Sequence, residues 1–464
     1  MKKLWVVALA SLGLLQTASL YAAADIKFEG DFRVRGIYAD NLTDANKDTP
    51  DEQAFADGRF RLKTTATAGI VSGIVTLDFT SSFIDPGTNA GLGCNVTGCT
   101  TGNYRFGSAN LGGSYNIVGV REAYLKLDLN MVKLAFGRGQ IKLGHSLILD
   151  DTADGILAKF GAGPVNIMLA DAKLRESNAV GPSTTGVGTG GDTDLYIAKF
   201  GFAHEEMHNL GLFVTYLNDR GPSFIAASTT PDKTDLWTAG VTADARLGIV
   251  SLSGEFDYLT GSQDNLSGTT PGSTDLKGWN VLLDAGLKVA MFDVDITGLY
   301  TTGDKSATDN KTNINGISGD FVLANILVND NVNSDREGQC ASIGGARIGS
   351  GGASCVGGLG IRAIRVGAGF ELGMLGKGSH TEVAAIWAQT GERPAAVAGV
   401  SAKKDLGIEI DLNHRQKLDE NVSVGVNLGY LFAGDFWKTA GATAAGEGPA
   451  DNIVKGIVSL NYMF

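Results

Sequence analysis

After its first twenty residues, the 464-residue chain contains no apolar run long enough to form a membrane-spanning helix. Such a helix needs about 20 predominantly apolar residues, so a bundle of membrane helices is excluded. Proline occurs only 9 times and histidine 5 times. Basic residues are also few, 38 against 50 acidic ones. This balance excludes nucleic acid as a partner, because phosphate binding requires a basic face.

Residues 1–24 have the features of a secretory signal peptide. A short basic start is followed by an apolar stretch over residues 4–20, and three alanines stand before Asp25. We therefore expect the signal peptide to be removed on export. Residues 25–464 are then expected to fold as a single domain.

Apolar and polar side chains alternate along much of the chain. In one early segment Phe32 and Val34 fall on one face, whereas Arg33 and Arg35 fall on the other, as the two faces of a β-strand require. Later segments repeat this pattern over about ten residues, the length of a membrane-spanning strand. There are eighteen such segments, or 16 if two weak ones are misread, beginning near residues 26, 56, 73, 116, 132, 155, 165, 194, 209, 235, 249, 278, 291, 361, 380, 404, 421 and 453.

The connections between these segments are alternately short and long. The long connections cover residues 39–55, 84–114, 145–154, 172–192, 218–234, 260–277, 301–360, 389–403 and 433–451. This asymmetry is typical of outer-membrane barrels, which have short periplasmic turns and long extracellular loops. The sequence therefore predicts an all-β fold, a transmembrane antiparallel β-barrel of 18 strands, with 16 as the alternative.

A barrel of this size has direct consequences for function. Unpaired backbone groups in lipid cost several kcal/mol each, so a spanning sheet must close on itself. With 16 to 18 strands the interior is wide enough to hold water. We therefore expect a pore for passive diffusion of small hydrophilic, charged solutes in the outer membrane of a Gram-negative bacterium, with no enzymatic activity and no cofactor. An export channel for an anionic polysaccharide and a barrel sheath around an electron-transfer cytochrome remain alternatives.

Charged residues on the polar stripes are candidates for the pore wall. The first two segments carry the basic residues Arg33, Arg35, Arg59, Arg61 and Lys63. Segments that would lie on the opposite side of an 18-strand ring carry the acidic residues Glu255, Asp257, Asp284, Asp293 and Asp295. Such walls would set up a field across the pore that orients polar solutes. Alternatively, these residues are only solvated charges or structural ion pairs.

The longest outer loop, 301–360, contains an apolar run at residues 321–328 that favours burial. Two arrangements are open for this loop. It either folds into the lumen as a constriction or packs on neighbouring loops at the surface.

The cysteines favour disulfides over a metal site. Cys94 and Cys99 share one loop, and Cys340 and Cys355 share another. In an oxidising compartment two local disulfides are the natural pairing. His204 and His208 match the H-E-x-x-H zinc motif, but they lie in a short link between two predicted strands, where no helix brings them together. We expect no metal site.

Two acidic segments, residues 44–48 and 150–155, have some character of a calcium loop but lack its spaced glutamate. We therefore interpret them as solvated acidic loops.

The chain ends in an alternating segment whose last residue is Phe464. An aromatic C-terminal residue of this kind is typical of the signal that the barrel assembly machinery recognises, so we expect that machinery as a partner. The other expected partners are outer-membrane lipid and lipopolysaccharide. Both a monomer and a trimer are compatible with the sequence.

The first half of the chain resembles the alginate-export-type porin family. The resemblance rests on short motifs: Asp31-Phe32-Arg33-Val34-Arg35, Arg59-Phe60-Arg61-Leu62, Arg121-Glu122-Ala123-Tyr124-Leu125, and Gly137-Arg138-Gly139-Gln140 followed by Gly144, Asp154 and Gly155. It implies a monomeric 18-stranded channel. It also implies a pore wall that contains Arg33, Arg35, Arg59, Arg61 and Arg138.

Overall fold

The structure is a computed structural model of the 464-residue chain. It describes residues 24–41, 45, 52–84, 117–175, 192–204, 208–220, 232–265, 272–303, 311–313, 316–317, 321–328, 359–373, 376, 378–392, 403–440 and 450–464. Residues 1–23 of the expected signal peptide and all four cysteines lie outside these residues. The disulfide pairing therefore stays a prediction.

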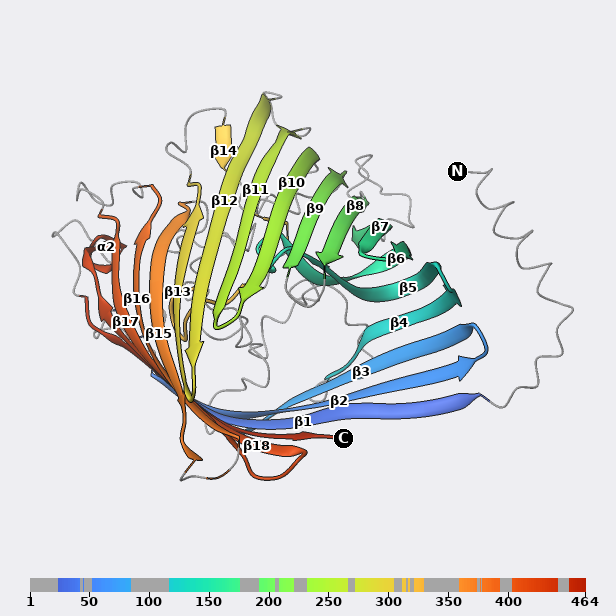
Figure 1. Ribbon diagram of the computed structural model, residues 1–464. Helices are drawn as coiled ribbons and strands as arrows, with labels where there is room; N and C mark the ends of the chain where they lie inside the picture. Colours follow the sequence, from blue (N-terminus) through green and yellow to red (C-terminus); the bar gives the residue numbers. More distant parts are fainter. Residues whose placement is uncertain are drawn as a thin grey trace, which may run out of the picture.

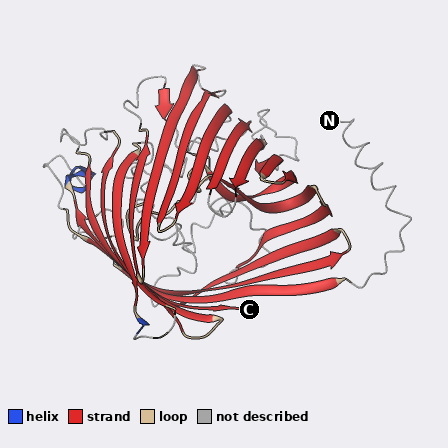
Figure 2. Cartoon of the chain, in the orientation of Figure 1, coloured by secondary structure: helices blue, strands red, loops and turns tan. Residues whose placement is uncertain are grey.

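Almost every regular element is a β-strand (Figure 2). The strands are β1 (Asp25–Asp40), β2 (Gln53–Ala68), β3 (Val71–Ile84), β4 (Ile117–Leu129), β5 (Val132–Leu143), β6 (Leu149–Ala162), β7 (Val165–Arg175), β8 (Thr193–His204), β9 (His208–Asp219), β10 (Asp232–Leu247), β11 (Val250–Asn265), β12 (Gly272–Val289), β13 (Phe292–Thr301), β14 (Lys311–Asn313), β15 (Ile361–Glu371), β16 (Ser379–Thr390), β17 (Asp405–Lys417), β18 (Val422–Ala433) and β19 (Ile453–Met463). The short helix α2 (Asp435–Ala440) lies between the last two strands. No helix in the described part of the chain is long and apolar enough to cross a membrane.

The strands form one closed antiparallel ring (Figure 1). Each long strand pairs with the next along the chain, and β1 pairs with β19 to close the seam, with Val34 opposite Leu460. The three-residue β14 pairs in parallel with β12, while β13 pairs directly with β15. The strand β14 is therefore not one of the strands of the barrel wall. The prediction of an 18-stranded barrel is confirmed. Closure gives every wall strand two neighbours, which satisfies the backbone hydrogen bonds that lipid would leave unpaired.

The two faces of the ring differ as the alternation predicts. On β12 the side chain of Leu283 is 62% exposed, whereas that of the preceding Leu282 is 3% exposed. Exposed apolar residues such as Phe28, Ile296 and Ile408 recur on the same outward face of the other strands. This face is suited to hydrocarbon, and the opposite face surrounds the interior.

The strand ends show where the pattern fails. The strand β6 begins at Leu149, not near residue 155, and β12 begins at Gly272, not near residue 278. The β5–β6 connection is therefore residues 144–148 only, which breaks the strict short and long alternation of the prediction. At the outer rim the outward positions leave the hydrocarbon and become polar, so apolar residues no longer mark the lipid side.

The acidic segment 150–155 lies in β6 and is not a solvated loop. Outward side chains from β5 reach its carboxylates: the Nε2 of Gln140 donates to Asp150 at 2.7 Å, and Arg138 donates to Asp154 at 2.6 Å. Asp150 and Asp154 are therefore paired with side chains of the neighbouring strand β5. The other acidic segment, 44–48, lies outside the described residues except for residue 45.

The seam places the C-terminal aromatic residue in the wall. Phe464 and Gly30 exchange two backbone hydrogen bonds of 3.0 Å, and the Phe464 ring stacks on Phe60 at 6.3 Å between centroids. A Cβ atom on Gly30 would lie 2.6 Å from the Phe464 ring, so this position requires glycine. Recognition of Phe464 by the assembly machinery stays a prediction.

The H-E-x-x-H motif is not helical. The strand β8 ends at His204 and β9 begins at His208, and the two residues pair across the hairpin. The zinc motif needs both histidines on one helical face, so its sequence match does not correspond to that site. In the described part of the chain, no group of three or more His, Cys, Asp or Glu residues is placed to hold a metal ion.

Candidate functional site: the lumen and its two inward segments

The basic residues of β1 and β2 lie side by side on the inner face, but most of them are paired. Arg35 donates to Asp57 with both Nε and Nη2, of which the first bond is 2.9 Å long. Two further inward ion pairs of 2.6 Å join Arg59 to Asp31 and Arg61 to Asp78. The sequence indicated these arginines as pore-wall candidates but did not indicate the three aspartates as their partners. The alternation could have indicated these aspartates, because they lie on the same inward polar faces of β1, β2 and β3.

Arg33 and Lys63 differ from their neighbours in the wall. Neither has an ion-pair partner among the described residues, and both lie on the inner face of the ring. As far as the described ranges extend, no carboxylate directly neutralises the positive charge that they keep on this side of the lumen.

Arg138 lies on the other face of the barrel. It stands two residues from the outward Phe136 on β5, and it pairs with Asp154, whose side chain is 60% exposed. Its apolar neighbours Ile141 and Leu143 are buried on the inner side. The structure therefore does not place Arg138 in the pore wall that the resemblance implied.

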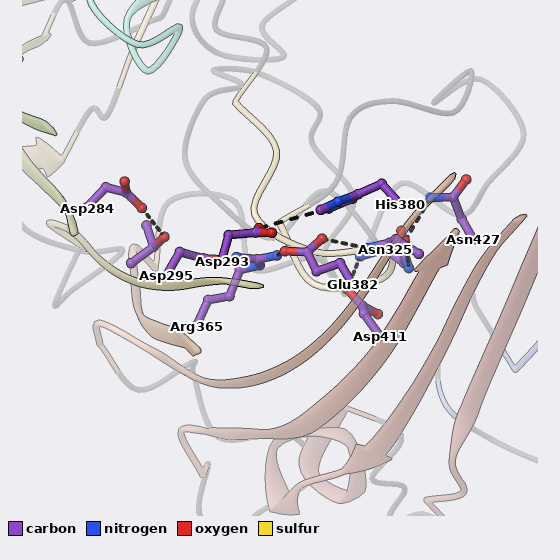
Figure 3. A network of polar contacts seen from close by, with 11 residues as sticks. Asp284, Asp293, Asp295, Asn325, Arg365, His380, Glu382, Asp411 and Asn427 are labelled. Carbon is purple, nitrogen blue, oxygen red and sulfur yellow. Dashed lines mark hydrogen bonds and ion pairs between the residues drawn. The ribbon is translucent and has the colours of Figure 1, made fainter. Parts of the chain in front are cut away.

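A polar network covers the inner face of β12 to β17 (Figure 3). Its centre is Arg365 on β15, which donates to Asp295 on β13 and to Glu382 on β16. On the neighbouring strand Asp284 accepts a 2.7 Å hydrogen bond from Thr297. Asp293 lies 3.9 Å from the His380 ring. Of the predicted acidic residues of β12 and β13, only Asp295 thus pairs with Arg365, a cation that the sequence did not single out.

The segment 321–328 of the longest loop lies inside the barrel against β17. The backbone N–H groups of Ile326 and Leu327 each donate to the Glu409 carboxylate at 2.7 Å. Asn325 donates its backbone N–H to Asp411 at 3.0 Å. Glu409 and Asp411 alternate with the exposed Ile408 and Ile410, so the side of β17 that they occupy is the inner one. Of the two arrangements that the sequence left open, the inward one is observed for these eight residues.

The side chain of Asn325 extends the same anchorage. Its Nδ2 donates to the Asn413 side chain at 2.9 Å and to the Leu428 carbonyl at 3.1 Å, while Asn427 donates to Asn413 at 2.7 Å. Nearby, Leu323 and Leu327 are buried in an apolar cluster. The segment is therefore held by apolar packing as well as by hydrogen bonds.

A second inward segment, 144–148, crosses from β5 to the wall at β10 and β11. His145 donates its backbone N–H to Glu255 at 2.5 Å, and its ring nitrogens lie 2.9 Å from Glu255 and 3.0 Å from Asp244. Segment 144–148 also contacts the longest loop, because the backbone N–H of Ile317 donates to the Ile148 carbonyl at 2.9 Å. The predicted acidic residue Glu255 is thus an anchor for a chain segment. Asp257 is fully buried, within hydrogen-bonding reach of Asn280 at 3.4 Å.

The His145 contacts make its segment sensitive to pH. The hydrogen bond to Glu255 raises the pKa of His145 above its ordinary value of 6.5, with a further contribution from Asp244 and against the effect of burial. A raised pKa means that the anchor is complete below 6.5 and is lost as pH rises through the raised value. We expect current fluctuations in single channels to increase over that range and to be pH-independent in His145→Ala. Fluctuations that increase towards acid pH would contradict this assignment.

The two inward segments leave an open space between them. A cavity of about 490 Å³ is bounded by His145 on one side and by Phe321 and Asn325 on the other. Its wall includes Asp284 and Arg365, together with the remaining lining residues Ser253, Leu282, Thr297, Val322, Leu323, Ala324, Glu382, Asp411, Asn413 and Asn427. The described residues thus place one guanidinium among several carboxylates at the narrowed part of the lumen.

Comparison with known proteins identifies relatives in fold only. No family model matches the chain, and no curated protein matches its sequence. Among solved structures, OccAB1 of Acinetobacter baumannii has a TM-score of 0.54 at 12% identity, covering 97% of this chain and 99% of its own. OpdK of Pseudomonas aeruginosa, solved with vanillate, has a TM-score of 0.53 at 12% identity, covering 94% and 98%.

OccK8 (OprE) of Pseudomonas aeruginosa gives the same result, with a TM-score of 0.52 at 13% identity and coverage of 94% and 98%. These neighbours are Occ and Opd porins and do not support the alginate-export-type family that the sequence motifs resemble. Over nearly its whole length, the chain therefore has the fold of an outer-membrane porin.

Proposed function

We propose that the protein is a passive channel of the Gram-negative outer membrane for small hydrophilic solutes that carry charge. The observation that carries this proposal is the cavity between segments 144–148 and 321–328, which has a charged wall and opens onto a polar lumen. A closed barrel with an apolar outer face belongs in lipid. The remaining space inside accommodates small solutes.

The distribution of charge supports selection by sign. In a ring of 18 strands β2 and β11 are nine strands apart, so the basic wall of β1 and β2 faces the acidic wall around β11 to β13. Both walls combine paired and unpaired charges. Such opposed walls orient a solute that carries charge as it passes.

The same geometry weighs against the two alternatives. A cytochrome inside the barrel would need the volume that both inward segments occupy. A polysaccharide chain in transit would have to pass the same narrowed section. This also applies to alginate export, the function that the resemblance of the motifs suggests. Both segments are anchored by buried hydrogen bonds to the wall, so we favour small solutes over polymers.

Planar-bilayer recording tests the proposal. We expect steady single-channel conductance with a measurable preference for one sign of ion. A folded, heat-modifiable barrel that gives no conductance would contradict the proposed channel. No enzymatic step is proposed, and the pore wall residues are expected to act only through charge and shape.

The basic wall gives a specific prediction. In Arg59→Ala plus Arg61→Ala, the carboxylates Asp31 and Asp78 lose their partners, so the lumen becomes more negative on this side. The reversal potential in a salt gradient should shift towards cation selectivity. Arg138→Ala is the matched control, because this arginine faces outward, and it should leave the reversal potential unchanged. Equal shifts in both variants would rule out a selective role for the inner arginines.

A further inference from the structure

An uninterrupted row of aromatic side chains follows the outer face of one third of the barrel, six of its 18 strands. Each of the six consecutive strands β8 to β13 contributes one residue: Tyr196, Tyr216, Trp237, Tyr258, Trp279 and Tyr300. Several rings are stacked, including Tyr216 on Trp237 at 4.7 Å and Trp279 on Tyr300 at 4.4 Å. The row lies near the ends of the strands that carry the long loops. Outward aromatic girdles mark the boundary between hydrocarbon and lipid headgroups.

Cationic side chains lie along this row at its outer edge, and most of them are neutralised. Lys173 pairs with Asp192 and Asp194 at 2.8 and 3.0 Å. Further along the ring, Arg220 and Lys233 both pair with Asp235, at 2.8 and 3.2 Å. These carboxylates leave little positive charge for an external anion along this part of the aromatic row.

Two cations near the end of the row are different. Arg362 on β15 faces outward, and its guanidinium lies 5.4 Å from the centre of the Tyr300 ring. Lys277 stands on β12, two residues beyond Trp279 towards the outer loop, and is exposed on the same face. Neither has an acidic partner among the described residues. Both therefore present positive charge at the headgroup level, Arg362 stacked on an aromatic ring.

Polar donors stand beside both cations. In the sheet register Gln389 of β16 is opposite Arg362, and Thr260 of β11 is opposite Lys277. Residues that are opposite each other in an antiparallel pair point to the same face, so the amide and the hydroxyl also face outward. Two strand spacings of about 4.8 Å separate β12 from β15 across β13. Along the strands, Arg362 is opposite Tyr300, which is itself opposite Val281, so Lys277 lies four residues further out on β12. The combination is an amphipathic surface in which Arg362 and its donor lie beside the aromatic row, and Lys277 and its donor lie just beyond it.

We propose that Lys277 and Arg362, beside Trp279 and Tyr300, bind the phosphorylated sugar headgroup of a lipopolysaccharide molecule in the outer leaflet. Guanidinium and ammonium groups are the natural partners of phosphate oxygens. The hydrocarbon below the aromatic row receives the acyl chains, which distinguishes this ligand from a soluble phosphate. The inference rests on the proposed location in the outer membrane but not on transport.

The test measures lipopolysaccharide retained by the purified full-length barrel. Wild-type protein is incubated with lipopolysaccharide in detergent, separated from micelles, and analysed by native mass spectrometry. We expect bound lipopolysaccharide in the wild type and at least a ten-fold loss of affinity in Lys277→Ala plus Arg362→Ala, as removal of two charge-assisted contacts implies. The charge-retaining variant Lys277→Arg plus Arg362→Lys should bind nearly as the wild type does.

Two controls make the result specific. Lys142→Ala removes an exposed outward cation that Asp150 already neutralises at 3.6 Å, away from the aromatic row, and should bind as the wild type does. Lipopolysaccharide whose phosphates have been removed by a phosphatase should bind the wild type as weakly as intact lipopolysaccharide binds the double variant. Equal binding by wild type and double variant, or equal retention of the dephosphorylated ligand, would overturn the proposal. Conductance measured on the same samples reports separately on the proposed channel.

Discussion

Replacement of residues 321–328 by a flexible glycine-serine segment should raise single-channel conductance several-fold and reduce ion selectivity. These residues occupy the lumen beside β17, and their apolar side chains fill space that water and ions would otherwise use. The replaced segment also forms one side of the narrowed cavity, so its loss removes the contact of a passing solute with Asn325 and Phe321. Conductance in planar bilayers and reversal potential in a salt gradient measure both effects.

The matched control replaces residues 418–421, an exposed turn at the opposite end of the barrel, in the same way. This variant should keep the wild-type conductance. Glu409→Ala is the milder version of the main change, because it leaves the buried N–H groups of Ile326 and Leu327 without their acceptor, at about 1–3 kcal/mol for each unsatisfied group. It should give a flickering channel of intermediate conductance. An unchanged conductance in the segment replacement would mean that the segment does not limit the pore.

The second large effect is expected from Arg365→Ala. Within the described part of the chain, Arg365 is the one cation that contacts both Asp295 and Glu382, and its side chain is 13% exposed. Without it, the carboxylates at the narrowed section lose their nearest positive charge. We expect strong cation selectivity and slower passage of anionic solutes, measured as a shift in reversal potential and as uptake into liposomes.

The same substitution also tests the stability of the wall. Breaking a buried ion pair costs about 3–5 kcal/mol, and less here because water reaches the lumen. Heat-modified migration in gels should therefore show a lower unfolding temperature for Arg365→Ala. Arg365→Lys keeps the charge and should retain most of the wild-type selectivity. Arg362→Ala, which removes an outward arginine from the same strand, should leave selectivity unchanged; an equal shift in this variant would mean that the effect is not local to the lumen.

The sequence alone determined the architecture, because the physical constraint acts on every residue of the wall. Apolar and polar side chains must alternate along a strand that lies between lipid and water. The type of a residue such as Phe32 or Arg33 therefore indicates which face of the sheet it occupies. The eighteen strands were found, and most of their starts lie within three residues of prediction. The misplaced starts of β6 and β12 lie at the rim, where the outward side is no longer hydrocarbon.

Arg138 shows why a motif is weaker than the pattern around it. The family resemblance put it in the pore, whereas its register with Asp154 and its place beside Phe136 put it on the outer face. The polar rim explains both this error and the misreading of segment 150–155. At that level a charge no longer indicates the lumen.

What only the tertiary structure decided is which charges meet. Alternation fixes the side of the sheet on which a residue lies, but the ring register decides that Arg365 contacts Asp295 and Glu382. Likewise, an apolar run in a long loop favours burial without naming its site, and only closure of the barrel brings the backbone of residues 321–328 to Glu409 on β17. Strand identity depends on neighbours along the chain, whereas the shape of the pore depends on contacts between residues about 80 positions apart, for which local sequence carries no periodic signal.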